Sequence, residues 1–272
     1  MTDTIIIARS VTMDIIDDIT EFYELRDSEV LYFIKDNIRV TDWQYRVGYE
    51  LMCHEDNCVV TLTYDNEHLP LFGSLNHRDF QLFMKSLRKR ISPAVIKYFG
   101  CGEYGAHGFR PHFHFICFGW TPTDAEYFFT DEKGTRLYKS AFLSSIWKRG
   151  YITVCKNVTP RIVRYCCKYL QKGGQAPAPG LNPPYLFCSR RPGVGATLPV
   201  GLVDWENDKI YYDGRSRRIP RYYLSRAPDS VVADLKQRRN DWTDYFNSFF
   251  PVFDEQKQYY ERFKQIYRRL KK

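Results

Sequence analysis

The amino-acid sequence predicts an α+β fold, in which a central antiparallel sheet carries helices on one face and helical segments flank it at both ends. Three observations lead to this prediction. Between residues 58 and 172, local patterns follow in the order strand, helix, strand, strand, helix, strand, helix. The second and third strands are separated by a short turn-like stretch, so they can pair as a hairpin. Hydrophobic residues make up 44% of the 272 residues, which is enough for a packed core.

Each element of this region has its own residue pattern. Cys58–Tyr64 is rich in β-branched residues and ends at an Asp-Asn pair, as strands do. A helix follows Gly73-Ser74, and Ser92-Pro93 ends it. The apolar stripe of this helix consists of Phe80, Phe83, Met84 and Leu87. The other expected elements are strands at 95–104, 112–120 and 151–155 and helices at 140–147 and 159–172, the last of which begins at Thr159-Pro160 and stops at Gly173-Gly174.

The flanking regions indicate the domain boundaries. Residues 12–39 and 43–52 show helical spacing of apolar positions, and residues 230–272 suggest long helical segments. A Pro/Gly-rich stretch, residues 175–184, separates the central region from the C-terminal part of the chain. We therefore expect a helical N-terminal segment at 1–50, a central domain at 51–175 and a largely helical C-terminal region at 176–272.

The charge of the chain favours a polyanionic partner. Lysine and arginine exceed aspartate and glutamate by 40 to 32, a formal net charge of +8. A basic balance in a folded protein fits nucleic acid, although ordinary solubility explains it equally well. The N-terminus is acidic, so we expect a nucleic-acid surface to come from the later basic segments. These are Arg88-Lys89-Arg90, Arg190-Arg191, Arg215–Arg218 and Lys271-Lys272.

The cysteines and the hydropathy pattern bear on the compartment. The 8 cysteines include no Cys-x-x-Cys pair, so a disulfide framework or a zinc ribbon is not indicated. Cys53, His54 and Cys58 can in principle gather a metal, but reduced thiols are the better interpretation. No signal peptide or membrane-spanning run is recognisable. We expect a protein of its host's cytoplasm without a membrane partner.

The first candidate site is His112-Phe113-His114. On a strand, residues two apart point to the same face, so both imidazoles converge while Phe113 packs into the core. If the hairpin is centred on His107-Gly108, Glu103 lies directly across from His112, with the Cβ atoms roughly 5 Å apart. Two imidazoles and a carboxylate suit Mg²⁺ or Mn²⁺. A register slip of one residue would instead place Glu103 on the opposite face. The alternative is a pair of polar residues on a solvated strand face.

The second candidate site lies in the helix expected at 159–172. Tyr165 and Tyr169 are four residues apart and stack on one helix face, and Lys168 and Lys172 form a parallel row beside them. Tyrosine has a reference pKa of about 10 and needs a neighbouring cation to act as a nucleophile at neutral pH. The lysine row supplies such a field. The alternative is an amphipathic helix whose tyrosines are half-buried core residues.

Together these two patterns resemble the HUH endonucleases, which are named for a histidine–hydrophobic–histidine strand and carry a tyrosine-bearing helix. The chain is most similar to the replication initiators of microviruses, particularly of the gokushovirus type. The resemblance covers roughly residues 52–223, and the order and spacing of its blocks make it specific. The matching blocks are Thr61–Asp65, Arg78–Lys85, Gly102–Gly105, Arg110–His114, Tyr165–Lys172 and Ser189–Gly193.

The resemblance implies a palm- or RRM-like topology and a metal-dependent, site-specific DNA endonuclease and strand transferase, with residues 51–175 as the nicking domain. It implies that His112, His114 and Glu103 hold Mg²⁺ or Mn²⁺, and that Tyr165 or Tyr169 attacks single-stranded origin DNA. The 5′ phosphate becomes tyrosine-linked, and the freed 3′-OH serves the host's polymerase and helicase. Lys168 and Lys172 would stabilise charge at the nucleophile. The expected DNA contacts are Arg88, Lys89, Arg110, Arg190 and Arg191.

Two other functions are compatible with the sequence. A related HUH transposase or relaxase would share the histidine pair, although paired tyrosines argue against a one-tyrosine transposase. A decayed initiator would bind single-stranded DNA without nicking it. The first fifty residues are unlike the short cysteine-rich opening expected of the family, which keeps the second alternative open.

Overall fold

The computed structural model describes residues 28–105, 108–132, 134–168, 178–197 and 201–249. The chain divides into two compact units. The larger unit is Arg39–Pro199, and the smaller unit combines Met1–Ile38 with Val200–Lys272. The domain boundaries expected from the sequence, 1–50, 51–175 and 176–272, stay a prediction.

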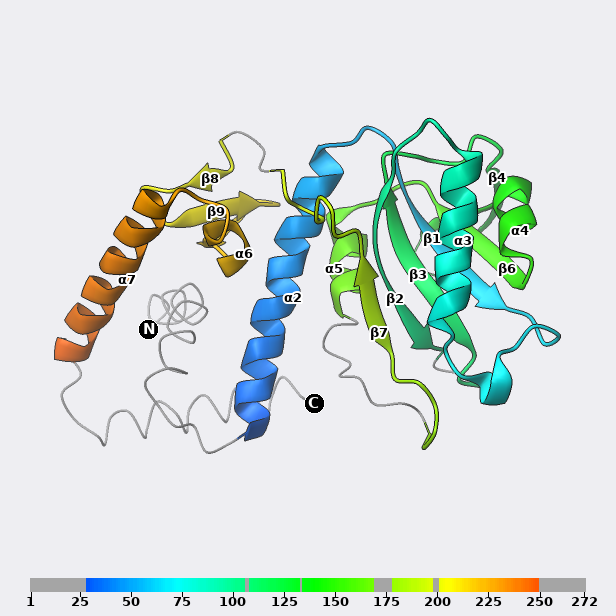
Figure 1. Ribbon diagram of the computed structural model, residues 1–272, viewed down its shortest axis with the longest axis horizontal. Coiled ribbons are helices and arrows are strands. Elements are labelled where there is room, and N and C mark those ends of the chain that lie inside the picture. Colours follow the sequence, from blue (N-terminus) through cyan, green and yellow to red (C-terminus); the bar gives the residue numbers. More distant parts are fainter. Residues whose placement is uncertain (1–27, 106–107, 133, 169–177, 198–200, 250–272) are drawn as a thin grey trace. The chain divides into compact units, whose positions relative to one another are not determined.

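The larger unit is built on a seven-stranded sheet in which all paired neighbours run antiparallel (Figure 1). The strand order is β4-β5-β6-β1-β3-β2-β7. The strands are β1 Asn57–Tyr64, β2 Lys97–Tyr104, β3 Pro111–Phe118, β4 Glu126–Thr130, β5 Arg136–Lys139, β6 Gly150–Cys155 and β7 Tyr185–Cys188. The predicted strands at 58–64, 95–104, 112–120 and 151–155 correspond to β1, β2, β3 and β6, which places all four in the middle of the sheet.

The predicted helices of this region are also present. They are α3 His77–Arg90, α4 Ala141–Trp147 and α5 Pro160–Lys168, and a 3-10 turn covers Leu71–Gly73. Two starts are explained by capping, because the Asn76 side chain accepts a hydrogen bond from the backbone N–H of Arg78 and Ser140 accepts one from Leu143. The segments expected to be helical at 28–39 and 43–52 form one continuous helix, α2, Ser28–Met52. The expected end of α5 near Lys172 lies outside the described residues.

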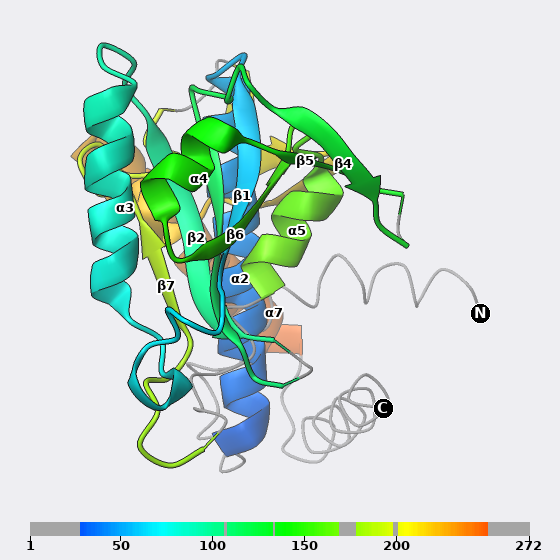
Figure 2. The ribbon, with the colours of Figure 1, turned by 90° about the vertical axis from the view of Figure 1, so that its right-hand side faces the viewer.

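The two faces of the sheet carry different cores. On one face, side chains of β1 and β3 such as Val60, Leu62 and Phe115 pack against α3 and α4. On the other face, Ile116 and Phe118 pack with Val163 of α5 and with side chains of α2 beyond Arg39. Figure 2 shows α3 and α5 on opposite sides of the strands. The predicted α+β class with a central antiparallel sheet is therefore confirmed. The expectation of helices on one face is corrected, because apolar side chains alternate on both faces of β3 and each face needs a cover.

A buried carboxylate fastens three segments of the larger unit. Glu50 of α2 is only 1% exposed and accepts hydrogen bonds from Lys97, His54 and the backbone N–H of Gly195. Burial raises the pKa of this carboxyl, but the hydrogen bonds outweigh burial and leave the pKa below its ordinary value. Gly195 has φ +70°, and a Cβ there would lie 2.6 Å from the Cα of Arg46. Glycine is required at this position for the loop after β7 to reach α2.

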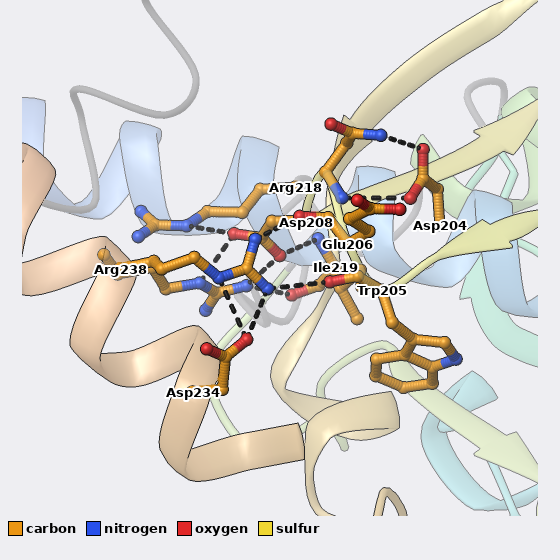
Figure 3. Close-up of polar contacts among 10 residues, drawn as sticks. Asp204, Trp205, Glu206, Asp208, Arg218, Ile219, Asp234 and Arg238 are labelled. Atoms are coloured by element: carbon orange, nitrogen blue, oxygen red, sulfur yellow. Dashed lines mark hydrogen bonds and ion pairs between the residues drawn. The ribbon is translucent and has the colours of Figure 1, made fainter.

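The smaller unit contains a three-stranded sheet of order β10-β9-β8. Its elements are β8 Val203–Asp204, β9 Lys209–Tyr212, β10 Arg215–Arg218, α6 Arg221–Leu224 and α7 Asp229–Phe249. Asp208 accepts hydrogen bonds from Arg218 and Ile219, and Arg238 forms an ion pair with Asp234 and donates to the carbonyls of Trp205 and Glu206 (Figure 3). Two arginines of this unit therefore already have partners within it. In the part of the chain that the structure describes, we found no helix long and apolar enough to cross a membrane.

We expect Glu50→Gln to destabilise the larger unit by about 3 kcal/mol at pH 7, since Lys97 and His54 lose their buried counter-charge. The lowered pKa means that the carboxylate stabilises the fold above its ordinary pKa of 4.5, and that this contribution is lost as the pH falls below that value. Urea unfolding of both proteins at pH 7 and at pH 3 measures the difference. The gap should shrink at the lower pH.

Glu55→Gln is the matched control, because Glu55 is an exposed carboxylate in the following loop and its change should leave stability near that of the wild type. An equally large gap for Glu50→Gln at both pH values would show that the charge is not what holds the three segments together.

Candidate metal centre

The hairpin of β2 and β3 brings a carboxylate and two imidazoles together. Glu103 pairs directly with His112, and Cys101 pairs with His114, which is the register expected from a hairpin centred on His107-Gly108. His107 itself lies outside the described residues. Because His112 and His114 are two residues apart on β3, both point to the face that also carries Glu103.

The ligand atoms of these three residues converge. Oε1 of Glu103 lies 3.1 Å from Nε2 of His112 and 3.3 Å from Nε2 of His114. One ligand atom from each residue lies within 4.8 Å of the other two. Glu103 is buried and both histidines are half-buried, so the cluster borders solvent without being open to it. Within the described ranges, no other group of three His, Cys, Asp or Glu residues meets this condition.

Hydrogen bonds behind the rings orient both imidazoles. Nδ1 of His112 lies 2.9 Å from the carbonyl oxygen of Arg110, and Nδ1 of His114 lies 2.7 Å from Oγ1 of Thr61. A carbonyl only accepts, so Nδ1 of His112 carries the proton. The neutral ring then directs the lone pair of Nε2 at the Glu103 carboxylate. Two such electron-rich atoms approach each other favourably only with a proton or a cation between them, which is the arrangement of a metal-binding histidine.

The electrostatics of Glu103 point the same way. Burial raises the pKa of its carboxyl, but hydrogen bonds from His112 and His114 more than compensate and lower the pKa to about 2. The residue is therefore a carboxylate at neutral pH. Two nitrogens and a carboxylate oxygen can hold a divalent ion and leave further coordination positions for other oxygens.

The other metal candidate from the sequence does not assemble. His54 is bound to Glu50, the buried Cys58 directs its thiol toward the carbonyl oxygen of Trp120, and Cys53 is exposed. None of the eight cysteines is in a disulfide. The expectation of reduced thiols at these positions agrees with this arrangement.

The helix α5 lies over the same face of the sheet. Val163, Cys166 and Cys167 of α5 belong to the apolar cluster that contains Ile116 and Phe118 of β3. Burial raises the pKa of Cys166 to about 12, and the negative charge of Glu103 adds to this effect. The helix therefore runs close to the carboxylate. Tyr165 and Lys168 belong to α5, but their side chains are not described, and Tyr169 and Lys172 lie outside the described residues.

The arginines and the lysine expected to contact DNA are spread over the unit. Arg110 lies next to the cluster, where its guanidinium donates to the carbonyl of Tyr64 and to the side chain of Asn66. Arg88 and Lys89 lie on α3, on the other face of the sheet, with Arg88 near the ring of Tyr98. Arg190 and Arg191 follow Ser189, which is hydrogen-bonded to Tyr98. Tyr98 is five residues from Glu103 along β2, roughly 17 Å at the rise of a strand.

Sequence reasoning missed the contact of Thr61 with His114. Thr61 lies within the predicted strand 58–64, and its alternation with Val60 and Leu62 signals a side chain on the face away from α3. The missing information was the pairing of β1 with β3, which joins residues 53 positions apart.

We expect Thr61→Val to weaken Mn²⁺ binding about 10- to 100-fold, because the Nδ1 atom of His114 loses its partner and the ring its fixed orientation. Electron paramagnetic resonance of free Mn²⁺ during titration measures the affinity. Thr153→Val is the matched control, since Thr153 pairs with Thr61 on the same face and lies one strand further from His114. Equal affinities of the two variants would contradict the role of Thr61.

Comparison with known proteins places the cluster in a recognised sequence region. Residues 57–174 match the family model of the replication-associated protein ORF2. The chain is 34% identical over 138 residues to the replication-associated protein VP4 of Bdellovibrio phage phiMH2K, which covers 47% of this chain and 44% of that protein. It is 34% identical over 141 residues to the replication-associated protein ORF4 of Chlamydia phage 1, 49% of this chain and 35% of that protein.

A third relative, the replication-associated protein ORF2 of Spiroplasma virus 4, is 31% identical over 140 residues, 48% of this chain and 43% of that protein. The chain thus spans less than half the length of each of these relatives. No solved structure matches it. The region that carries the metal-binding cluster and α5 matches the family of ORF2 replication-associated proteins, and the resemblance to microvirus replication proteins is confirmed.

Proposed function

We propose that this chain initiates rolling-circle replication of a small phage genome by nicking single-stranded origin DNA and rejoining its ends. The observation that carries the proposal is the Glu103–His112–His114 cluster beneath a tyrosine-bearing helix, in a region similar to phage replication-associated proteins. A site that combines a divalent ion with a helix-borne phenol suits transfer of a phosphoryl group to tyrosine.

In this proposal His112, His114 and Glu103 hold Mg²⁺ or Mn²⁺. The bound ion would polarise the scissile phosphate and offset the negative charge that develops during the reaction. The protein contributes the fixed donor geometry, because Thr61 and the carbonyl of Arg110 hold both rings before any ligand arrives. The low pKa of Glu103 keeps its charge available over the whole neutral range.

The nucleophile in this proposal is Tyr165 or Tyr169. The phenolic oxygen forms a bond to the phosphorus, the bond from phosphorus to the 3′ oxygen breaks, and the phenolic proton is passed on as the 3′-OH leaves. The bond energy is conserved in the phosphotyrosine, so the 3′-OH of a second cut can reverse the step and close a circle. Lys168 and Lys172 would stabilise the phenolate or the phosphate. Two tyrosines allow the cuts of successive rounds to alternate.

DNA contacts in this proposal come from Arg88, Lys89, Arg110, Arg190 and Arg191, with the phosphate backbone as their target. The freed 3′-OH would prime synthesis by the host's polymerase together with its helicase, in the cytoplasm of a bacterial host. Arg110 has the clearest structural support among these residues, because its guanidinium is already held beside the cluster.

We expect a covalent protein–DNA adduct when the protein is incubated with Mn²⁺ and overlapping single strands tiled over the DNA that encodes it. The adduct should survive denaturant in a gel. Tyr165→Phe and Tyr169→Phe should each lose one of the two cuts and the double variant both, since phenylalanine keeps the ring and removes the nucleophilic oxygen. Tyr127→Phe, an exposed tyrosine of β4, serves as the control. An adduct formed by the double variant would show that the nucleophile is elsewhere.

We expect His112→Ala and His114→Ala to abolish Mn²⁺-dependent cleavage while single-stranded DNA binding persists, because the donors of the ion are lost and the basic surface is not. Cleavage and fluorescence-anisotropy binding assays on the same strands separate the two effects. His68→Ala, in the exposed loop after β1, should cleave as the wild type does. Undiminished cleavage by either cluster variant would argue against the metal site. Binding without cleavage by the wild type would identify a decayed relative.

A further inference from the structure

Tyr151 is a large exposed aromatic residue on the same sheet face as the metal-binding cluster. It lies in β6 and is 69% exposed. Thr63 of β1 pairs with His112 on one side and with Tyr151 on the other. The four residues Glu103, His112, Thr63 and Tyr151 therefore form one row across four strands. Two strand spacings separate His112 from Tyr151, roughly 10 Å.

The sheet surface between the cluster and Tyr151 is polar. Thr61, Thr63 and Thr153 lie there, all half-buried and on the same face. The next row of that face, which contains Ile116, belongs to the apolar cluster covered by α5. Arg110 places a cation at the carbonyl of Tyr64, one residue beyond Thr63. The uncovered part of the face thus offers hydroxyl groups and a cation, bounded by the cluster on one side and by a phenol ring on the other.

The backbone of Tyr151 is held firmly although its ring is exposed. Gly150 has φ +138°, and a Cβ there would lie 2.3 Å from the backbone N of Asp65 and 2.4 Å from the carbonyl oxygen of Thr63. The backbone N–H of Asp65 donates to the carbonyl of Arg149 at 2.9 Å. Arg149 is also paired with Asp79 on α3. Only glycine permits this close approach, so the start of β6 is locked against the end of β1 and the ring has a fixed base.

We propose that Tyr151 is a stacking platform for a base of single-stranded DNA whose backbone crosses the threonine surface toward the metal-binding cluster. A flat ring on a fixed backbone stacks on any base, since every base has a π-face, and the threonine hydroxyls can donate to phosphate oxygens. A polar strip next to a lone aromatic ring fits a nucleic-acid strand better than a protein partner, whose interface would need a larger apolar centre. The inference rests on the proposed function and adds to it the position of a specific nucleotide contact.

The test uses a short thymine single strand with interspersed 2-aminopurines, whose fluorescence is quenched when the base stacks. Binding is measured by anisotropy in Mg²⁺. We expect Tyr151→Ala to weaken binding about 5- to 150-fold and to relieve the quenching, because one base loses its stacking partner. Tyr151→Phe should retain affinity and quenching, since the ring is kept.

Tyr127→Ala is the matched control. Tyr127 is 61% exposed in the same sheet, but it pairs with Tyr138, which packs on the α3 and α4 side. It should bind and quench as the wild type does. Wild-type behaviour of Tyr151→Ala would overturn the proposal, and so would equal losses in both alanine variants. Loss of the covalent adduct in Tyr151→Phe would also overturn it, because that outcome makes the phenolic oxygen rather than the ring the functional group.

The adduct assay on wild-type protein separates this inference from the proposed function. If the wild type forms no adduct but its quenching depends on Tyr151, the platform stands and nicking does not. If the wild type forms the adduct and Tyr151→Ala binds and quenches normally, nicking stands and the platform does not.

Discussion

The register of the hairpin between β2 and β3 is the constraint on which the candidate site depends. It places Glu103 across from His112, and a slip of one residue would turn the carboxylate toward α3. The core holds that register, because Phe113 and Phe115 alternate with the histidines and are fully buried under α3 and α4. The same strand therefore anchors itself with one face and presents its ligands with the other. A change in the core beneath β3 would reach the site through the register.

The face that carries the ligands is divided between packing and chemistry. Its far rows, with Ile116 and Phe118, are sealed by α5, whereas its near rows remain polar and lead from the cluster to Tyr151. The helix that completes the core is also the helix that bears the tyrosine motif, so one packing interaction serves both purposes. The raised pKa of Cys166 records how near its thiol lies to the Glu103 carboxylate.

The basic residues are distributed in a way that bears on how DNA would be held. Arg110 is beside the cluster, whereas Arg190 and Arg191 lie toward the opposite end of β2, and Arg88 and Lys89 lie on the other face. A strand in contact with both ends of the sheet would have to run along it rather than meet a single basic patch. The loop that carries Arg190 and Arg191 is held by Gly195 against the buried Glu50, so its position does not depend on DNA.

The sequence by itself determined the features that depend on local pattern: the class of the fold, the central strands, α3 with its apolar stripe, and the pairing of Glu103 with His112 only nine residues away. Only the tertiary structure decided the features that depend on distant pairing. The bond of Thr61 to His114 and the place of Tyr151 beside the cluster require β1 to lie between β3 and β6, which no local periodicity encodes. The short strands β4 and β5 also lack a pattern of their own, because the exposed aromatic residues of β4 do not alternate with polar ones. Helices cover both faces for the same physical reason: a helix shows its apolar stripe in the sequence, but which face it covers is settled only when the sheet has formed.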